Sequence, residues 1–413
     1  MRIPFILLII LLVSTFLIDF YLWTDVKRAT KKRSWRIFFW LTTLVCWVFL
    51  IVTLCLPRRA EGSDLLRVMW MLYIFISVYV AKLGYVVCSL FGRLWRCVVK
   101  NGPRLPIART VGVFVGIALF AVLWEGVWFG RKNIVVNRVE VESPSIPRPF
   151  NGYTIAQISD LHVGTWGNDT TFVSALVDSV NSLHPDLIVF TGDIVNRESR
   201  ELLPFVRTLS RLKAKDGVVS ILGNHDYGDY MDWKNPQERE VNNILLSQLE
   251  AEMGWDLLNN TRRFMVRDND SIMIIGVENI GDPPFPSYGD LEKALPSSKD
   301  SLFHQNDKKY KILLSHNPAH WDEYVSHKTN IALTLAGHTH AMQMMIKIGG
   351  WEWSPAVFRY PLWGGMYERL NEQGNETKMY VNIGAGEVGM PSRLLSAYPE
   401  ITLFTLRHVS HRN

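Results

Sequence analysis

Four long apolar stretches dominate the first third of the chain. They run over residues 3–23, 37–56, 65–90 and 111–129. At about 1.5 Å per residue, each is long enough to cross a hydrocarbon core of about 30 Å. Only Arg2 precedes the first stretch and no small-x-small cleavage pattern follows it, so we interpret it as a retained helix and not as a signal peptide. The pattern predicts a membrane domain with four transmembrane helices over residues 1–130.

Basic residues in the loops predict how these helices are oriented. Lys and Arg resist translocation, so loops rich in them stay in the cytoplasm. The first and third loops are rich in basic residues and the second is poor. The first loop contains Lys27, Arg28, Lys31, Lys32, Arg33 and Arg36, and the third contains Arg93, Arg96, Lys100, Arg104 and Arg109. The second loop contains only Arg58 and Arg59. We therefore expect a multi-pass protein of the cell membrane whose N-terminus and C-terminal domain both lie outside the cytoplasm.

Three ionisable residues fall within or near the ends of the spans, namely Asp19, Lys82 and Glu125. Intramembrane charges are candidates for function. All three lie near an expected interface, where a long side chain can extend its charge toward water. We therefore expect them to be exposed at the interface, without a transport role.

The apolar pattern changes after residue 130. Residues 131–142 alternate as a strand does, and residues 143–149 contain three prolines, which predicts a stiff connector within a segment 131–152. Five short apolar runs then predict buried strands over residues 154–158, 187–190, 218–222, 311–314 and 331–335. Residues 170–183 carry the spacing of an amphipathic helix. Strands and helices in this order predict an α/β catalytic domain over residues 153–405, followed by a tail, 406–413.

Composition and charge differ between the two parts. With 48% hydrophobic and 20% charged residues, the chain is not a disordered protein. The net charge of +5 is made of +13 over residues 1–132 and −8 over the remainder. The basic balance is therefore a membrane signal, and we expect no nucleic-acid partner. All four cysteines precede residue 100, which excludes a disulfide framework or a thiolate metal site from the second part.

Each of the five predicted strands ends in residues with oxygen or imidazole groups. The following loops read Ser159-Asp160-Leu161-His162, Gly192-Asp193, Gly223-Asn224-His225-Asp226, Ser315-His316-Asn317 and Gly337-His338-Thr339-His340. Open α/β sheets place their sites at the carboxyl ends of strands. In the pairs Asp160/His162 and His338/His340, a one-residue gap directs both side chains the same way in an extended segment. A single histidine or Gly-Asp pair is commonly a surface residue or a turn, but five such loops in one domain indicate a metal site.

These motifs, in this order, resemble the calcineurin-like metallophosphoesterase family over roughly residues 150–405. Tyr227 after GNHD, the LSHNP segment at 314–318 and Gln343 after GHTH look like its membrane-anchored branch of YkuE-type and YaeI-type phosphodiesterases. The resemblance implies a four-layer α/β/β/α sandwich with two divalent metal ions. Asp160, His162 and His340 would hold the first ion. Asn224, His316 and His338 would hold the second, with Asp193 as the bridge.

The resemblance also implies a chemistry. A nitrogen and oxygen ligand set without sulfur suits Mn, which we expect, or Fe or Zn. A hydroxide between the two ions would be the nucleophile. His225 would protonate the leaving oxygen or contact the phosphate, and Asp226 would orient its ring. Arg197, four residues after Asp193, would meet the phosphate; an exposed surface arginine is the alternative.

Two features depart from the family pattern or extend it. Ala341 and Met342 stand where many members carry two glycines, which leaves the shape of the pocket floor open. Aromatic residues then crowd into residues 351–367: Trp351, Trp353, Phe358, Tyr360, Trp363 and Tyr367. They form either a packing cluster or an apolar wall that faces the membrane and admits a lipid-like phosphoester.

These expectations lead to one main function and two alternatives. The main expectation is a membrane-anchored, metal-dependent phosphoesterase that acts on a phosphomonoester or phosphodiester, including a lipid-linked one, without an obligate protein partner. A UDP-2,3-diacylglucosamine pyrophosphatase of lipid A synthesis is an alternative that would require a domain facing the cytoplasm. A non-catalytic membrane scaffold is the other.

Overall fold

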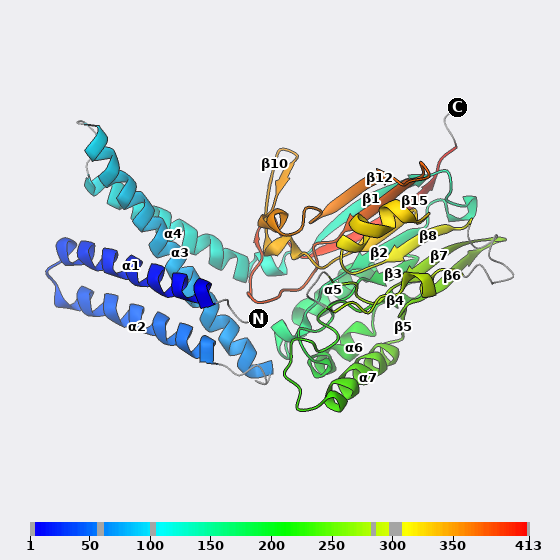
Figure 1. Cartoon of the computed structure of the whole chain (residues 1–413), viewed down its shortest axis with the longest axis horizontal. Coiled ribbons are helices and arrows are strands. Elements are labelled where there is room, and N and C mark those ends of the chain that lie inside the picture. The colour runs from blue at the N-terminus through cyan, green and yellow to red at the C-terminus, as the bar shows by residue number, and fades with distance from the viewer. Residues whose placement is uncertain (1–4, 56–61, 100–104, 282–285, 297–307, 411–413) are drawn as a thin grey trace. The chain divides into compact units, whose positions relative to one another are not determined.

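The computed structural model describes residues 5–55, 62–99, 105–281, 286–296 and 308–410. Arg58, Arg59, Lys100 and Arg104, used above for orientation, lie outside these ranges. The chain folds as two compact units, one of residues 1–128 with 389–392 and the other of residues 129–388 with 393–413 (Figure 1).

The first unit consists of four helices: α1 (Phe5–Ala29), α2 (Arg33–Cys55), α3 (Gly62–Val98) and α4 (Leu105–Trp128). Each is long and apolar enough to cross a membrane. Most of their large apolar side chains are exposed in the absence of lipid, which is the surface that a bilayer covers. The four transmembrane helices expected from the sequence are confirmed, and the chain is a multi-pass membrane protein.

Buried polar contacts connect these helices, which corrects the expectation for Asp19 and Lys82. Lys82 Nζ lies 2.7 Å from Asp19 Oδ1, and both side chains are largely buried. Tyr79 Oη and Trp47 Nε1 donate to Asp19 Oδ2, at 2.5 and 3.1 Å. The two charges therefore pair inside the bundle and do not reach out separately to the interface, because pairing offsets the cost of removing them from water.

A second carboxylate binds two arginines in the same unit. Asp25 of α1 forms ion pairs with Arg93 of α3 and Arg109 of α4, whose Nη2 atoms lie 2.7 and 2.6 Å from Asp25 Oδ1. Tyr85 Oη also donates to it, at 3.0 Å. Asp19 and Asp25 thus join α1 to the other three helices through polar contacts, in addition to apolar packing.

The second unit contains two six-stranded sheets and a small three-stranded sheet. Their strand orders are β1-β15-β2-β3-β4-β5, β12-β13-β9-β8-β7-β6 and β11-β10-β14. The strands of the first large sheet are β1 (Val135–Ser143), β2 (Thr154–Ile158), β3 (Leu187–Phe190), β4 (Val218–Ser220), β5 (Trp255–Leu257) and β15 (Glu400–His408). Those of the second are β6 (Thr261–Arg267), β7 (Asp270–Gly276), β8 (Tyr310–Leu314), β9 (Leu333–Ala336), β12 (Gly365–Leu370) and β13 (Glu376–Val381), and those of the third are β10 (Met344–Ile348), β11 (Trp351–Trp353) and β14 (Leu394–Leu395).

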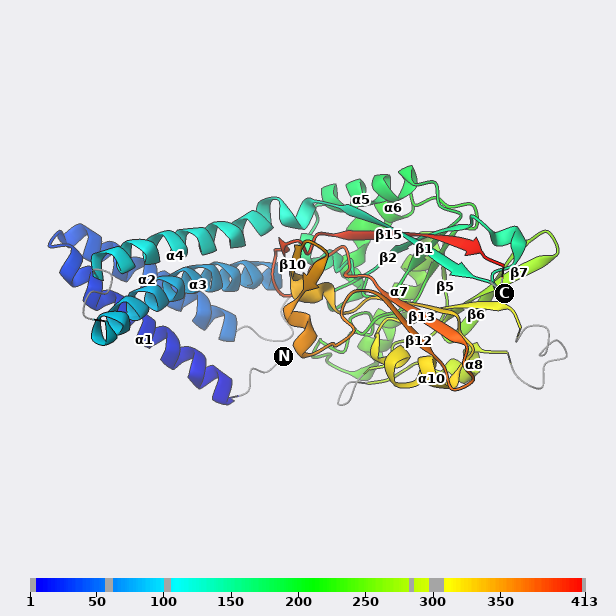
Figure 2. The ribbon, with the colours of Figure 1, turned by 90° about the horizontal axis from the view of Figure 1, so that it is seen from above.

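Apolar cores separate these elements into four layers. One core packs the first large sheet against α5 (Thr171–Ser182), α6 (Val206–Leu209) and α7 (Pro236–Glu252), with Leu176 and Phe190 fully buried. A second lies between the two large sheets, and a third packs the other sheet against α8 (Leu291–Ala294) and the turn at Trp321–Val325 (Figure 2). The expected α/β/β/α sandwich is confirmed.

Local sequence explains the central strands. β3 is the run Leu-Ile-Val-Phe, buried on all sides, and it pairs in parallel with β2 and β4. Such runs suit a strand covered on both faces. β8 and β9 pair in parallel in the second sheet. Because parallel neighbours end at the same edge, the loops after β2, β3 and β4 lie together, and so do those after β8 and β9.

The segment expected to be an extended connector belongs to the folded domain. β1 pairs in parallel with β15 along its whole length. Ile146 and Phe150, within and just after the proline-rich segment, are completely buried between the large sheets. The prolines therefore shape a turn that covers the core and do not act as a spacer, because their apolar neighbours gain more from burial than from extension.

Candidate metal centre

The loops after β2, β3, β8 and β9 bring six of the seven expected ligands into two groups. Asp160, His162 and His340 have ligand atoms within 4.8 Å of one another, and Asp193, His316 and His338 do so as well. All except His338 are buried. Residues up to 180 positions apart in the sequence thus meet at the ends of adjacent strands.

Asp193 lies between the two groups. Its Oδ2 atom is 3.2 Å from His316 Nε2 and 3.6 Å from His162 Nε2, so one carboxylate oxygen faces a residue of each group. Within the first group, Asp160 Oδ1 is 3.1 Å from His340 Nε2. In the same group, the Nε2 atoms of His162 and His340 are 3.0 Å apart. The position of Asp193 between the two groups is the one that a bridging carboxylate needs.

The chemistry of these groups fits divalent cations. Burial lowers the pKa of His162 well below its usual value, and burial with the nearby His316 charge lowers the pKa of His338 to about 3, so both rings are neutral. Burial favours the neutral form of Asp160, but the charge and hydrogen bond of His340 outweigh it and lower its pKa. Burial disfavours the charge of His316, but the charge and hydrogen bond of Asp193 outweigh it and raise the pKa of His316 to about 10. The neutral rings of His162 and His338 and the carboxylates offer lone pairs to a cation, which would displace the proton of His316.

Two tyrosines contact Asn224 and His338, which are two of the expected ligands. Asn224 Nδ2 donates to Tyr230 Oη at 2.8 Å, while its Oδ1 is buried with no hydrogen-bond partner among the described residues. Tyr360 Oη lies 3.1 Å from His338 Nε2, and the opposite nitrogen, Nδ1, faces His316. Outer hydrogen bonds of this kind fix ligand orientation and commonly accompany metal sites.

The ligand backbone is strained. Asp160, His162, Asp193, His338 and His340 all have φ between 43° and 76°. A side chain in this left-handed region costs on the order of 1 to 3 kcal/mol and persists where the surroundings enforce it. Glycine at position 386 lets its loop pack closely against this backbone, because a Cβ there would lie 1.8 Å from the Leu161 carbonyl oxygen. Such concentrated strain indicates a functional site.

His225 stands beside both groups, and its ring is held by a different residue from the one expected. Its Nδ1 lies 2.6 Å from the carbonyl oxygen of Asn196. The ring stacks on Tyr230, with centroids 4.2 Å apart, and meets His162 edge to face. A carbonyl oxygen only accepts hydrogen bonds, so Nδ1 carries the proton and Nε2 is the nitrogen available for proton transfer.

Asp226 does not orient this ring, which corrects the sequence-based expectation. Its carboxylate instead accepts the backbone N–H groups of Asp193, Ile194, Val195 and Gly223, at 2.8 to 3.2 Å. Burial, followed by the charge of Asp193, raises the pKa of Asp226 to about 7, against the effect of these N–H groups. Asp226 therefore joins the loop after β3 to the loop after β4 through backbone contacts.

Arg197 lies in the loop after Asp193 and is half-buried. Burial raises the pKa of the nearby Glu201 to about 7, and the charge of the Arg197 guanidinium acts in the opposite direction. The loop therefore carries Asp193, the Asn196 carbonyl and Arg197 in sequence. Its phosphate-binding role remains a prediction.

Sequence reasoning missed four residues of this environment: Asn196, Glu201, Tyr230 and Arg393. Arg393 is fully buried and donates to the carbonyl oxygens of Ile383, Gly386 and Ala397, which fixes the loop that approaches Leu161. Only Tyr230 carried a signal, because it lies in the polar insertion after GNHD. The others act through backbone groups, which leave no residue pattern.

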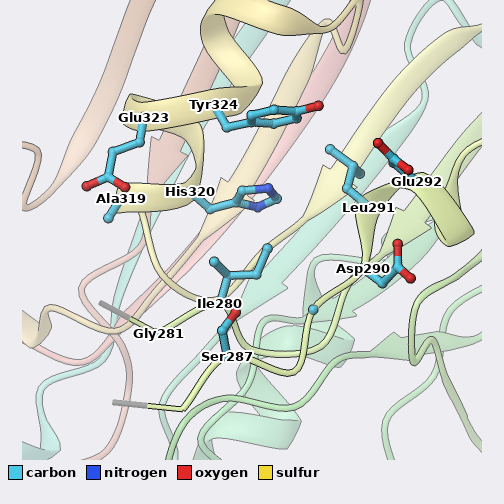
Figure 3. A pocket seen from close by; sticks show the side chains of 11 residues that line it. Ile280, Gly281, Ser287, Asp290, Leu291, Glu292, Ala319, His320, Glu323 and Tyr324 are labelled. Carbon is cyan, nitrogen blue, oxygen red and sulfur yellow. The ribbon is translucent and has the colours of Figure 1, made fainter. Parts of the chain in front are cut away.

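A cavity of about 520 Å³ lies elsewhere, between α8 and the turn that starts at Trp321 (Figure 3). His320, Tyr324 and Leu291 line it. None of the expected metal ligands, His225 or Arg197 lines this cavity. The ligand cluster is therefore formed by strand-end loops and is separate from the cavity.

Comparisons with known proteins agree with this architecture. Residues 153–342 match the family model of the calcineurin-like phosphoesterases. Residues 1–131 match a model described as the transmembrane domain of a probable calcineurin-like phosphoesterase with four spans. The two matches cover the two units separately.

Individual relatives show the same likeness. The chain is 29% identical to the uncharacterized metallophosphoesterase YkuE of Bacillus subtilis over 307 residues, 72% of this chain and 95% of that protein. It is 30% identical to a cattle transmembrane protein with metallophosphoesterase domain, over 74% of this chain and 63% of that protein. It is 26% identical to UDP-2,3-diacylglucosamine pyrophosphatase LpxG of Chlamydia muridarum, over 57% of this chain and 80% of that protein. The chain therefore carries a calcineurin-like phosphoesterase domain that follows a four-span phosphoesterase transmembrane domain.

Proposed function

We propose that this protein hydrolyses a phosphoester outside the cytoplasm with two divalent metal ions, for which Mn is the best candidate. The observation that carries the proposal is the convergence on Asp193 of two groups of expected ligands, all of them buried except His338. Asp160, His162 and His340 would hold one ion, and Asn224, His316 and His338 the other. When bound, the ions supply Lewis acidity and an activated water.

The chain's own residues support the remaining steps. Arg197 is proposed to orient the phosphate oxygens by charge-assisted hydrogen bonds. His225 keeps its Nδ1 proton on the Asn196 carbonyl, so a second proton on Nε2 can pass to the leaving oxygen as the ester P–O bond breaks. Asp226 holds the loops that carry Asp193 and His225 at a fixed separation, through the backbone contacts described above.

A lipid phosphoester is the substrate class that the surface beside the site supports. The strand β10 follows His340 and pairs with β11 in a hairpin whose turn is Gly349-Gly350, both with positive φ. Ile348, Trp351 and Phe358 are exposed by 69%, 57% and 84%. Trp363 is only 8% exposed and packs with Ala341. The aromatic stretch thus contains both a packing part and an exposed apolar part, and the latter suits acyl chains or a bilayer interface.

The alternative substrate is a UDP-diacylglucosamine, which the likeness to LpxG supports. Its two acyl chains would suit the same exposed hairpin. It is a cytoplasmic substrate, so it requires the opposite orientation of the domain.

The first prediction concerns the metals. The purified full-length protein with Mn should hydrolyse an aryl phosphodiester or monoester, and removal of metal by a chelator should abolish turnover until Mn is restored. A steady-state assay with metal analysis measures this. Unchanged turnover in metal-free protein would exclude a metal-dependent enzyme, whereas no turnover with two ions bound would favour a non-catalytic scaffold.

The second prediction separates the roles of His225 and Asp193. The variant His225→Ala should lose about 10²- to 10⁴-fold in kcat and keep its metal, because a general acid contributes about that much. Asp193→Ala should lose metal, because it removes the proposed bridge. Metal analysis beside kinetics distinguishes them, and metal loss in the histidine variant only would reverse the assignment.

The third prediction concerns the hairpin. Replacing Trp351 and Phe358 by Ala should lower turnover of a phospholipid in mixed micelles several-fold and leave turnover of a small aryl phosphate unchanged, because both side chains are exposed. The matched variant Tyr324→Ala, exposed on another element, should affect neither substrate. Equal losses on the two substrates would indicate a packing role instead.

The fourth prediction concerns orientation. The basic first and third loops should lie in the cytoplasm and the C-terminus outside it. A compartment-sensitive reporter fused to the C-terminus should therefore be active only as an extracytoplasmic fusion. A cytoplasmic signal would contradict the orientation and favour the nucleotide-linked substrate.

A further inference from the structure

Three charged side chains meet near one end of the membrane unit. Asp25 Oδ1 forms the ion pairs with Arg93 and Arg109 described above, and Arg109 Nε donates to Asp25 Oδ2 at 3.2 Å. The hydroxyl groups of Tyr85 and Ser89 donate to the same Oδ2 atom, at 3.0 and 3.4 Å. Each oxygen of the carboxylate therefore has at least two donors, which fills its capacity to accept hydrogen bonds.

This cluster carries one unbalanced positive charge, because two guanidinium groups share a single carboxylate. The other carboxylates in the described part of the membrane unit lie elsewhere. Asp19 has its own lysine partner. Asp64 stands at the opposite end of α3, 29 residues before Arg93, and Glu125 stands 16 residues after Arg109 on α4. At about 1.5 Å per residue, these separations are about 44 and 24 Å along the helices, too far to balance the second arginine.

Both guanidinium groups are held in place and remain partly accessible. The ring of Tyr21 lies against Arg93, with 4.8 Å between its centroid and the guanidinium carbon. The Tyr21 hydroxyl donates to Ser89 Oγ at 2.8 Å, which fixes the ring in turn. The side chains of Arg93 and Arg109 are nevertheless 32% and 26% exposed. Guanidinium groups that are fixed and accessible match the oxygens of a phosphate group.

The cluster lies at the depth of lipid headgroups. Asp25, Arg93 and Arg109 stand four, five and three residues from the nearest ends of their apolar spans. Each is therefore within about 8 Å of the end of its span, and the phosphate groups of a bilayer lie just outside the hydrocarbon core. Leu94 and Ile107, beside the arginines on α3 and α4, are exposed. A positive group within such an apolar surface suits an amphiphile better than a free ion.

We propose that Arg93 and Arg109 form a headgroup site for an anionic phospholipid, with Asp25 as the residue that holds the two guanidinium groups together. The phosphate oxygens accept N–H groups of both arginines and balance the remaining positive charge, while the acyl chains lie along the exposed apolar side chains of α3 and α4. Lys27 and Arg28, in the last turn of α1, add long-range attraction for anionic lipid. This site is separate from phosphoester hydrolysis and gives the membrane unit a function beyond anchoring.

Lipid titrations of the purified full-length protein test this inference. In neutral detergent micelles, phosphatidylglycerol should raise the Tm in a saturable way, because a ligand that binds only the folded state stabilises it. Phosphatidylcholine should raise it much less, because its headgroup amine cancels the phosphate charge. Inorganic phosphate at the same concentrations should have no effect. An equal rise with inorganic phosphate would show a free-anion site and overturn the lipid assignment.

Two variants of α3 locate the site. Arg93→Gln removes one positive charge and leaves Asp25 paired with Arg109, so the affinity for phosphatidylglycerol should fall roughly 10-fold, the effect of a lost hydrogen bond to a charged group. The matched variant Arg96→Gln removes the same charge from the last turn of α3, outside the Asp25 cluster. At about 0.15 M salt, which screens long-range attraction, it should change the affinity by less than about 2-fold.

A third variant keeps the test decisive if Arg93→Gln does not fold. Arg93→Lys retains the ion pair with Asp25 and loses the planar fork, so it should fold and lose affinity by an intermediate amount. Equal losses in the variants of Arg93 and Arg96, or no preference of the unmodified protein for phosphatidylglycerol, would overturn the site. Phosphoester turnover is not part of these measurements, so neither result bears on the proposed hydrolysis.

Discussion

The constraint on which this domain depends is the burial of carboxylates and imidazoles against one another at the ends of the strands. Asp193 is the centre of the arrangement, because its Oδ2 faces His316 on one side and His162 on the other. Water cannot satisfy these groups at such depth, and unpaired buried charge is costly. A positive charge, either on His316 or on a bound cation, compensates the carboxylates, and this arrangement connects the structure to the proposed metal-dependent chemistry.

The two-sheet architecture supplies the restraint that this arrangement needs. Five of the expected ligand residues have positive φ, a conformation that persists only where the surroundings enforce it. Asp226 binds four backbone N–H groups across two loops, and Arg393 binds four carbonyl groups behind the Leu161 loop. These contacts are made by side chains to backbone atoms, so they fix geometry without adding ligands. Catalytic residues can then be placed on strained loops because the β-strands below them are rigid.

Paired charges also position the helices of the membrane unit. Asp19 and Lys82 satisfy each other between helices, and Asp25 receives two arginines. A charge that is neither paired nor hydrated is unfavourable in a bilayer, so each partner fixes the position of the other. Polar residues thus connect α1 to α2, α3 and α4, where apolar side chains alone would have no preferred register.

The sequence by itself determined the four membrane helices, the central strands and most of the residues that gather at the strand ends. These features depend on local patterns: apolar length, β-branched runs and polar residues directly after strand ends. It did not determine which partners those residues have. The tertiary structure decided that Asn196 and not Asp226 contacts the ring of His225, that Asp19 pairs with Lys82, and that the proline-rich segment with Ile146 covers the core. The physical reason is that hydrogen-bond partners and burial are set by segments distant in sequence, which come together only when the sheets pack, and contacts to backbone atoms leave no mark on residue identity.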